Sequence, residues 1–163
     1  MGLREFSKEI SEVISRVIKS VATVFTVAYA YDLLLNPIPV RGAGSGFAVS
    51  NDLIVTNNHV ISGSKDITIV SYDGSKARGH IISAAPWKDL ALIAVDGVSL
   101  EPIKFGNSSD VKVGEIVFAV GNPLGLWGGP TVTMGVVSAV GRSVTVNPEL
   151  ILEDLIQTDA AIN

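Results

Sequence analysis

The sequence predicts an all-β protein with one amphipathic helix at its N-terminus. From Val21 onward, short runs rich in β-branched residues alternate with turn residues, a pattern typical of a sandwich or a barrel. Before Val21, apolar residues recur every three or four positions, as on one face of a helix. The 163 residues are 47% hydrophobic and 17% charged. This composition supports a buried core and excludes a disordered chain.

Residues 1–20 are predicted to form the helix. Its apolar face carries Leu3, Phe6, Ile10, Val13, Ile14, Val17, Ile18 and Val21. The opposite face mixes acidic and basic side chains, whereas a helix that lies on a membrane surface has a basic polar face. We therefore expect the helix to cover the body of the protein.

Residues 21–100 are predicted to form a first β unit. The candidate strands are Val21–Tyr31, Gly46–Val49, Leu53–Thr56, Ile67–Ser71, Gly79–Ala84 and Leu90–Val95. The pairs Asn51-Asp52 and Asp73-Gly74 are typical hairpin turns, so strands next to each other in the chain are expected to pair.

Residues 101–163 are predicted to form a second, smaller β unit. Its candidate strands are Glu115–Val120, Thr131–Val140 and Leu155–Thr158. The segment from Gly97 to Gly114 is rich in turn and polar residues, so we interpret it as the linker between the two units.

Charge and composition exclude several classes of function. The formal net charge is −4 and no basic stripe is visible, which argues against binding to nucleic acid. The chain has no cysteine, so disulfides, thiolate metal sites and a cysteine nucleophile are excluded. The most apolar segment, Val21 to Leu35, is too short for a membrane span. No secretory signal is evident, so the sequence as given indicates a cytoplasmic location.

His59 and His80 are the only histidines and therefore the only candidates for a histidine base. His80 has the place of an outward-facing strand residue, for which a solvated side chain is expected. His59 directly follows an apolar strand, and Asp89 lies at the start of another. An aspartate at that place can accept the Nδ1 proton of a histidine, fix its tautomer and stabilise its cation.

Seven short segments, in order, resemble the HtrA/Deg family of trypsin-like serine proteases. They are GSGF (44–47), TNNHV (56–60), DLAL (89–92), VGNPLG (120–125), TVT (131–133), GVVS (135–138) and QTDAAIN (157–163). The resemblance implies two antiparallel β-barrels of six strands each, with the catalytic residues in the cleft between them. It also implies that His59 is the general base and that Asp89 orients it.

In the family, QTDAAIN continues into a Gly-Asn-Ser-Gly-Gly segment that holds the nucleophilic serine and the oxyanion-hole amides, and this chain ends at Asn163. We therefore expect an incomplete second barrel, no hydrolysis by the chain as given, and exposed strand edges that favour a homo-oligomer. Ser45 lies in no nucleophile motif and is a poor substitute. Ser62 and Ser64 are equally poor.

No metal site is expected, because His59, His80 and Asp89 fit no ligand spacing, and no cofactor is implied. The resemblance implies that Ile162, beside the uncharged Ala161, lines a specificity pocket for small apolar side chains. Trp127 is a candidate pocket wall. The implied function is that of an ATP-independent endopeptidase of unfolded or misfolded proteins. Many members of the family are extracytoplasmic, so the resemblance leaves the location open. The alternative is a non-catalytic binding or assembly module derived from the protease fold.

Overall fold

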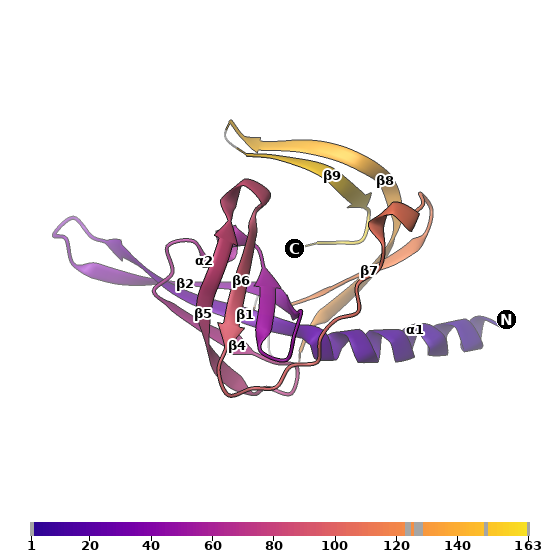
Figure 1. The fold of residues 1–163 in the computed structure, drawn as a ribbon, viewed down its shortest axis with the longest axis horizontal. Coiled ribbons are helices and arrows are strands. Elements are labelled where there is room, and N and C mark those ends of the chain that lie inside the picture. The colour runs from indigo at the N-terminus through magenta and orange to yellow at the C-terminus, as the bar shows by residue number, and fades with distance from the viewer. Residues whose placement is uncertain (1, 123–124, 126–128, 149, 163) are drawn as a thin grey trace.

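The chain folds into a β-barrel that is followed by a second sheet and preceded by a helix (Figure 1). The computed structural model describes residues 2–122, 125, 129–148 and 150–162. The all-β class is therefore confirmed. The helices are α1 (Leu3–Val17) and α2 (Asn58–Ile61), with short 3-10 turns η1 (Ile18–Ser20), η2 (Pro86–Lys88) and η3 (Ser108–Asp110).

The first group of strands closes into a barrel in the order β1-β2-β3-β6-β5-β4, with antiparallel pairing throughout. These strands are β1 (Val21–Tyr31), β2 (Pro37–Ala48), β3 (Leu53–Thr56), β4 (Asp66–Val70), β5 (Lys76–Ala85) and β6 (Leu90–Val95). Alternate residues point inward, as the strand period requires. The core consists of Ala22, Val24, Ala48, Ile54, Ile61, Ile67, Ile69, Ala77, Ala91, Ile93, Val95 and Leu100.

The second sheet has the order β7-β8-β9 and is open in the part of the chain that the structure describes. Its strands are β7 (Ile116–Gly121), β8 (Thr131–Asn147) and β9 (Leu150–Thr158). In Figure 1 the long β8–β9 hairpin arches over the barrel. Exposed apolar residues along it include Val140, Val144 and Ile151. An incomplete second barrel, as expected, leaves this surface open.

Several of the predicted strands are longer than expected, including β5 and β9, and the extension is largest in β2 and β8. Strand β2 begins at Pro37 rather than Gly46, and β8 continues to Asn147 rather than ending at Val140. Pro37 and Pro39 lie in the part of β2 that was not predicted, and Gly141 directly follows the predicted end of β8. In β8, Gly141 takes a left-handed φ of 67°, and the pairing register with β9 shifts on either side of it. A local irregularity therefore absorbs the glycine without ending the strand.

The expectation that the N-terminal helix covers the body of the protein is wrong. Helix α1 extends away from the barrel in Figure 1, and none of its residues is buried. Amphipathic periodicity shows that a helix has an apolar face, but it does not identify what covers that face. No described helix has the length and hydropathy needed to cross a bilayer.

Candidate active site

A cleft of ≈ 490 Å³ lies between the barrel and the second sheet. From the barrel it is lined by residues of β2 and α2, including Ser45 and His59, and from the other side by residues of β7 and β8. Ala161 and Ile162 also line it. The structure therefore brings together in one cleft three of the predicted site residues: His59, Ala161 and Ile162.

His59 is held at the cleft by the short helix α2, which starts directly after β3. Asn57 precedes the helix in an extended conformation, so the chain turns sharply at the end of the strand. The helix approaches β2 closely: a Cβ atom on Gly44 would lie 2.6 Å from a methyl carbon of Val60. Glycine at position 44 thus makes room for the helix that carries His59.

Asp89 lies between η2 and the start of β6, next to the end of β3 that precedes His59. Thr56 pairs with Ala91, so the end of β3 and the start of β6 are neighbours. The turn η2 precedes Asp89, whose backbone adopts a left-handed φ of 51°. Aspartate is one of the few non-glycine residues that tolerate this region. Pairing of two strands therefore places side chains thirty residues apart within contact distance.

Asp89 binds His59 through both carboxylate oxygens. Oδ2 lies 2.7 Å from Nδ1 of the imidazole, and Oδ1 accepts a hydrogen bond of 2.9 Å from the backbone N–H of His59. The side-chain amide of Asn57 donates to Oδ2 at 3.3 Å and to the backbone carbonyl of Asp89 at 3.0 Å. The Asp89 side chain is 17% exposed and that of His59 71% exposed. The carboxylate is thus shielded and fixed, while the imidazole remains open to the cleft.

This geometry defines the chemistry available to the histidine. Because a carboxylate accepts hydrogen bonds, the proton of the neutral imidazole resides on Nδ1, next to Asp89. Nε2 then carries the lone pair that can accept a proton. When it does so, the carboxylate stabilises the resulting imidazolium. The pair is suited to general base catalysis.

The segment 158–162 is anchored on β8. The Thr133 hydroxyl donates to the carbonyl of Ala161 at 2.7 Å, and the backbone N–H of Val136 donates to Oδ1 of Asp159 at 2.7 Å. Ala160 is buried. These contacts fix the backbone on both sides of Ala160 and so determine where Ile162 enters the cleft. Thr133 and Asp159 lie in two of the segments that carry the family resemblance, but neither residue was assigned a role from the sequence.

Ser45 joins the barrel to the second sheet. Its hydroxyl accepts a 2.8 Å hydrogen bond from the backbone N–H of Asn122, and its carbonyl accepts one of 2.7 Å from the Thr56 hydroxyl. Asn122 is buried and its side-chain amide donates to the Thr23 hydroxyl at 3.1 Å. These contacts give Ser45 a structural role at the base of the cleft.

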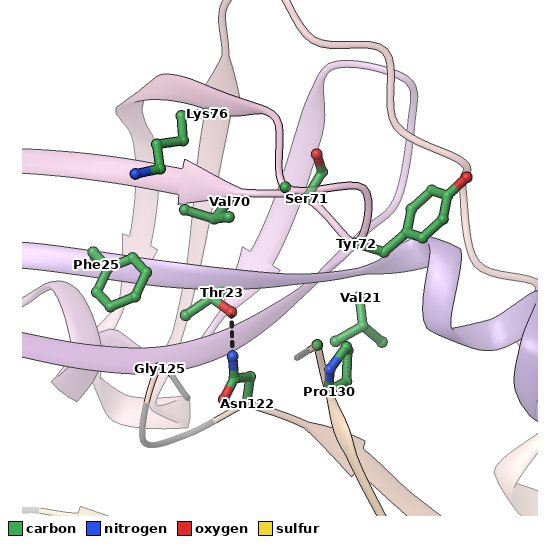
Figure 2. A pocket seen from close by; sticks show the side chains of 12 residues that line it. Val21, Thr23, Phe25, Val70, Ser71, Tyr72, Lys76, Asn122, Gly125 and Pro130 are labelled. Atoms are coloured by element: carbon green, nitrogen blue, oxygen red, sulfur yellow. Dashed lines mark hydrogen bonds between the residues drawn. The ribbon is translucent and has the colours of Figure 1, made fainter. Parts of the chain in front are cut away.

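A second pocket, of ≈ 340 Å³, is lined by Asn122 and by residues of β1 and β4 (Figure 2). Its walls are mainly apolar and include Val21, Phe25 and Pro130, with Lys76 at one side. It contains neither His59 nor Asp89. The candidate pocket wall Trp127 lies outside the residues that the structure describes.

His80 is exposed, as expected, but it is not solely solvated. Its Nε2 lies 2.8 Å from Oδ2 of Asp96, forming a second histidine–carboxylate pair that the sequence did not suggest. This pair is distinct from that of His59 and Asp89. Among the described residues, no group of three or more His, Cys, Asp or Glu side chains is arranged to hold a metal ion.

The sequence and the fold are similar to those of known proteins. Residues 44–163 match the model of the trypsin-like peptidase domain. The chain is 44% identical over 122 residues to a probable periplasmic serine endoprotease DegP-like of Rickettsia prowazekii, and 46% identical over 121 residues to one of Chlamydia pneumoniae. Each alignment covers 74% of this chain and 24% of the relative.

Solved structures of HtrA-type proteases have the same fold. A variant of the HtrA-type protease AlgW with a decapeptide superposes with a TM-score of 0.84 and 30% identity, covering 94% of this chain and 51% of that one. AlgW with a tripeptide gives a TM-score of 0.79 and 32% identity, covering 94% and 46%.

The chain belongs to the family of trypsin-like peptidase domains. Within it, the chain is a member of the HtrA/Deg group of serine proteases. It spans about a quarter of the length of the curated relatives it matches. The relatives named above are described as periplasmic, so they do not support the cytoplasmic location indicated by the sequence as given.

Proposed function

We propose that this chain is part of a serine endopeptidase in which His59 is the general base and Asp89 orients it. The observation that carries the proposal is the 2.7 Å contact between His59 Nδ1 and Asp89 Oδ2 at a cleft that also contains Ile162. In this role His59 takes the proton of a serine hydroxyl that attacks the peptide carbonyl, and then gives it to the leaving amine.

The proposed substrates are unfolded or misfolded polypeptides. Ala161 and Ile162 give their side of the cleft no charge, which disfavours a preference for basic side chains and favours small apolar ones. Such side chains become accessible when a protein unfolds. The structures of AlgW with a decapeptide and a tripeptide support a peptide as the occupant of this fold. The names of the relatives support action outside the cytoplasm.

The nucleophile of the proposed mechanism is the serine of a Gly-Asn-Ser-Gly-Gly segment, which the 163 residues do not contain. Ser45 is the serine that lines the cleft among the described residues, and its hydroxyl already bonds to Asn122. A polypeptide of these 163 residues is therefore proposed to be inactive. The oxyanion-hole amides of that segment would be missing as well, which removes a large part of transition-state stabilisation.

The test compares the 163-residue chain with a longer protein that includes the sequence encoded downstream of Asn163. We expect the longer protein to hydrolyse casein and to react with a fluorophosphonate probe, and the 163-residue chain to do neither. In the longer protein, His59→Ala abolishes hydrolysis, whereas His80→Ala, which breaks the other histidine–carboxylate pair, leaves it unchanged. A stop codon after Asn163, stoichiometric labelling of the shorter chain, or full activity of His59→Ala would disprove the proposal.

The open second sheet favours one further candidate, a non-catalytic module that works by assembly. Apolar side chains exposed on β8 and β9 include Val146 and Ile156. Such a sheet tends to pair with another copy. We expect light scattering to show a homo-oligomer of the 163-residue chain. A monomer at all concentrations, with amides of β9 protected from hydrogen exchange, would contradict this candidate.

A further inference from the structure

We propose that the β1–β2 hairpin binds a zwitterionic lipid surface by inserting its apolar tip. The arm, defined here as residues 28–40, extends beyond the barrel and projects from it in Figure 1. Strand β4 pairs with β1 only as far as Val27, and β3 pairs with β2 only from Gly46 onward. Among the described residues, no third strand pairs with the arm, which is therefore a two-stranded ribbon.

The tip of the arm consists of three adjacent leucines that are almost completely exposed. The exposed fractions of Leu33, Leu34 and Leu35 are 104%, 82% and 79%. Isolated apolar residues on a surface are ordinary, but a contiguous group at the end of a projecting arm marks a site of interaction. Asp32 is the only charged residue in the arm.

Both faces of the arm are apolar, which favours lipid over a protein partner. On one face Tyr29 and Tyr31 lie opposite Pro39 and Pro37, and on the other Ala28 and Ala30 lie opposite Val40 and Ile38. Residues 33–42 are all exposed. A protein surface covers one face of such a ribbon, whereas lipid surrounds both faces and the tip. Tyrosine is also enriched where the apolar and headgroup layers of a membrane meet.

The polar groups of the tip are largely satisfied within the arm. Asp32 Oδ1 accepts hydrogen bonds of 2.8 Å from the N–H groups of Leu34 and Asn36, and Oδ2 accepts one of 3.0 Å from the Asn36 side chain. Pro37 and Pro39 have no N–H group to desolvate, and prolines make an edge a poor template for another strand. The charge of Asp32 limits the arm to the interface and argues against deep insertion.

Cationic residues lie at the base of the arm, at the level of Val27. Arg41 pairs with Val27, and the backbone N–H of Lys65 donates to the Val27 carbonyl at 2.8 Å. Asp66, at the same level, lies 3.9 Å from Arg78. From Val27 to Tyr31 the strand rises about 13 Å. With the leucines below the headgroups, Arg41 and Lys65 are thus placed to meet the lipid phosphates.

The test is co-sedimentation of the 163-residue chain with phosphatidylcholine vesicles. We expect the partition coefficient to fall at least tenfold in the triple variant Leu33→Ser/Leu34→Ser/Leu35→Ser. The matched control, Leu3→Ser/Val113→Ser/Met134→Ser, removes three exposed apolar side chains elsewhere and should bind like the original chain. The tip lies outside the barrel, so both variants should retain the circular dichroism spectrum of the original chain.

A second measurement locates the tip directly. Leu34→Trp should show blue-shifted emission with vesicles and quenching by lipids brominated on the acyl chains, whereas Val113→Trp should show neither. The proposal would be overturned if the tip variant bound vesicles as well as the original chain, or if the control variant lost as much binding as the tip variant. Absence of quenching of Trp at position 34 would also overturn it. The proposal would also be overturned if the triple variant at the tip changed the oligomeric state and left vesicle binding unchanged, because the arm would then bind a second copy of the chain.

Discussion

Gly135 lies directly against the backbone of Ala160. A Cβ atom at position 135 would be 2.2 Å from the Ala160 nitrogen and 2.4 Å from Oδ1 of Asp159. Backbone atoms cannot move aside as the end of a flexible side chain can. We therefore expect Gly135→Ala to displace the segment that carries Ile162, at a cost of about 1–3 kcal/mol in the free energy of unfolding. Chemical denaturation measures the cost.

Gly106→Ala is the matched control for that experiment, because a Cβ atom at position 106 meets no atom within 4 Å. Its stability should equal that of the original chain. Hydrogen exchange should show faster exchange of the Ala160 amide in Gly135→Ala and no change in the control. Unchanged protection of Ala160 in Gly135→Ala would contradict the close approach.

Gly44→Ala should shift the helix that carries His59. The added methyl group would meet both methyl carbons of Val60, at 2.6 and 2.7 Å. Because the obstacle is a side chain, Val60→Ala should remove it. We expect the double variant Gly44→Ala/Val60→Ala to lose less stability than the sum of the losses of the two single variants. A double-mutant cycle by chemical denaturation gives the coupling, and strictly additive losses would show that the two residues do not compete for space.

The two histidines should have opposite neutral tautomers. Asp89 faces Nδ1 of His59 and Asp96 faces Nε2 of His80, so each carboxylate holds a proton on a different ring nitrogen. Long-range proton–nitrogen correlation spectra of the neutral rings distinguish the two forms. If both histidines had the same neutral tautomer, either the His59–Asp89 contact or the His80–Asp96 contact would be contradicted.

Asp89→Asn should change the tautomer of His59 and leave His80 unaffected, because the new amide N–H₂ group can donate to Nδ1 and move the ring proton to Nε2. In the longer protease the same substitution should lower kcat by about 10⁴-fold. Asp96→Asn is the control and should affect only His80. Full activity of Asp89→Asn would remove the orienting role proposed for Asp89.

The turn at the tip of the arm should be sensitive to acid. The hydrogen bond from the Asn36 side chain, followed by that from its backbone, holds the pKa of Asp32 below its ordinary value of 3.8. The contribution of the carboxylate to the turn is therefore complete above pH 3.8 and is lost as the pH falls through the lowered pKa. Carboxyl carbon shifts followed by NMR report this titration.

Asn36→Ala should raise the pKa of Asp32 toward its ordinary value. Asp73 serves as the internal control, since its pKa is lowered mainly by the Ser71 hydroxyl and should not respond. An unchanged titration of Asp32 in the variant would show that Asn36 does not stabilise the carboxylate.

The local sequence predicted strands wherever alternation and turn residues agreed. The bounds of β1, β3 and β6 are those expected from the β-branched runs at Val21, Leu53 and Leu90. The first half of β2 was missed because Pro37 and Pro39 normally interrupt a sheet. They are tolerated here because, in the part of the chain that the structure describes, this region of β2 pairs with β1 alone and no strand pairs with its other edge. Whether a proline interrupts a strand thus depends on the position of that strand in the sheet, which the local sequence does not encode.

The site, like the fold, was predicted in part from the sequence. His59 and Asp89 were singled out because the chain has only two histidines and because the segments around both residues resemble the HtrA/Deg family. Strands β3 and β6 pair and bring the two side chains together. Asn57 was not given a role, although it lies in the same segment as His59, because an amide beside a strand end is ordinary. The pairing of His80 with Asp96 depends on how β5 lies against β6, a relationship between distant segments.

The backbone of Asp89 limits which residues can stand at that position. A left-handed φ of 51° is accessible at low cost to glycine, asparagine and aspartate. Glycine has no side chain to reach His59, and asparagine has no charge with which to stabilise the imidazolium. Glutamate keeps the charge but incurs the backbone strain of a left-handed residue. Conformation and chemistry each allow several residues here, and aspartate alone meets both requirements.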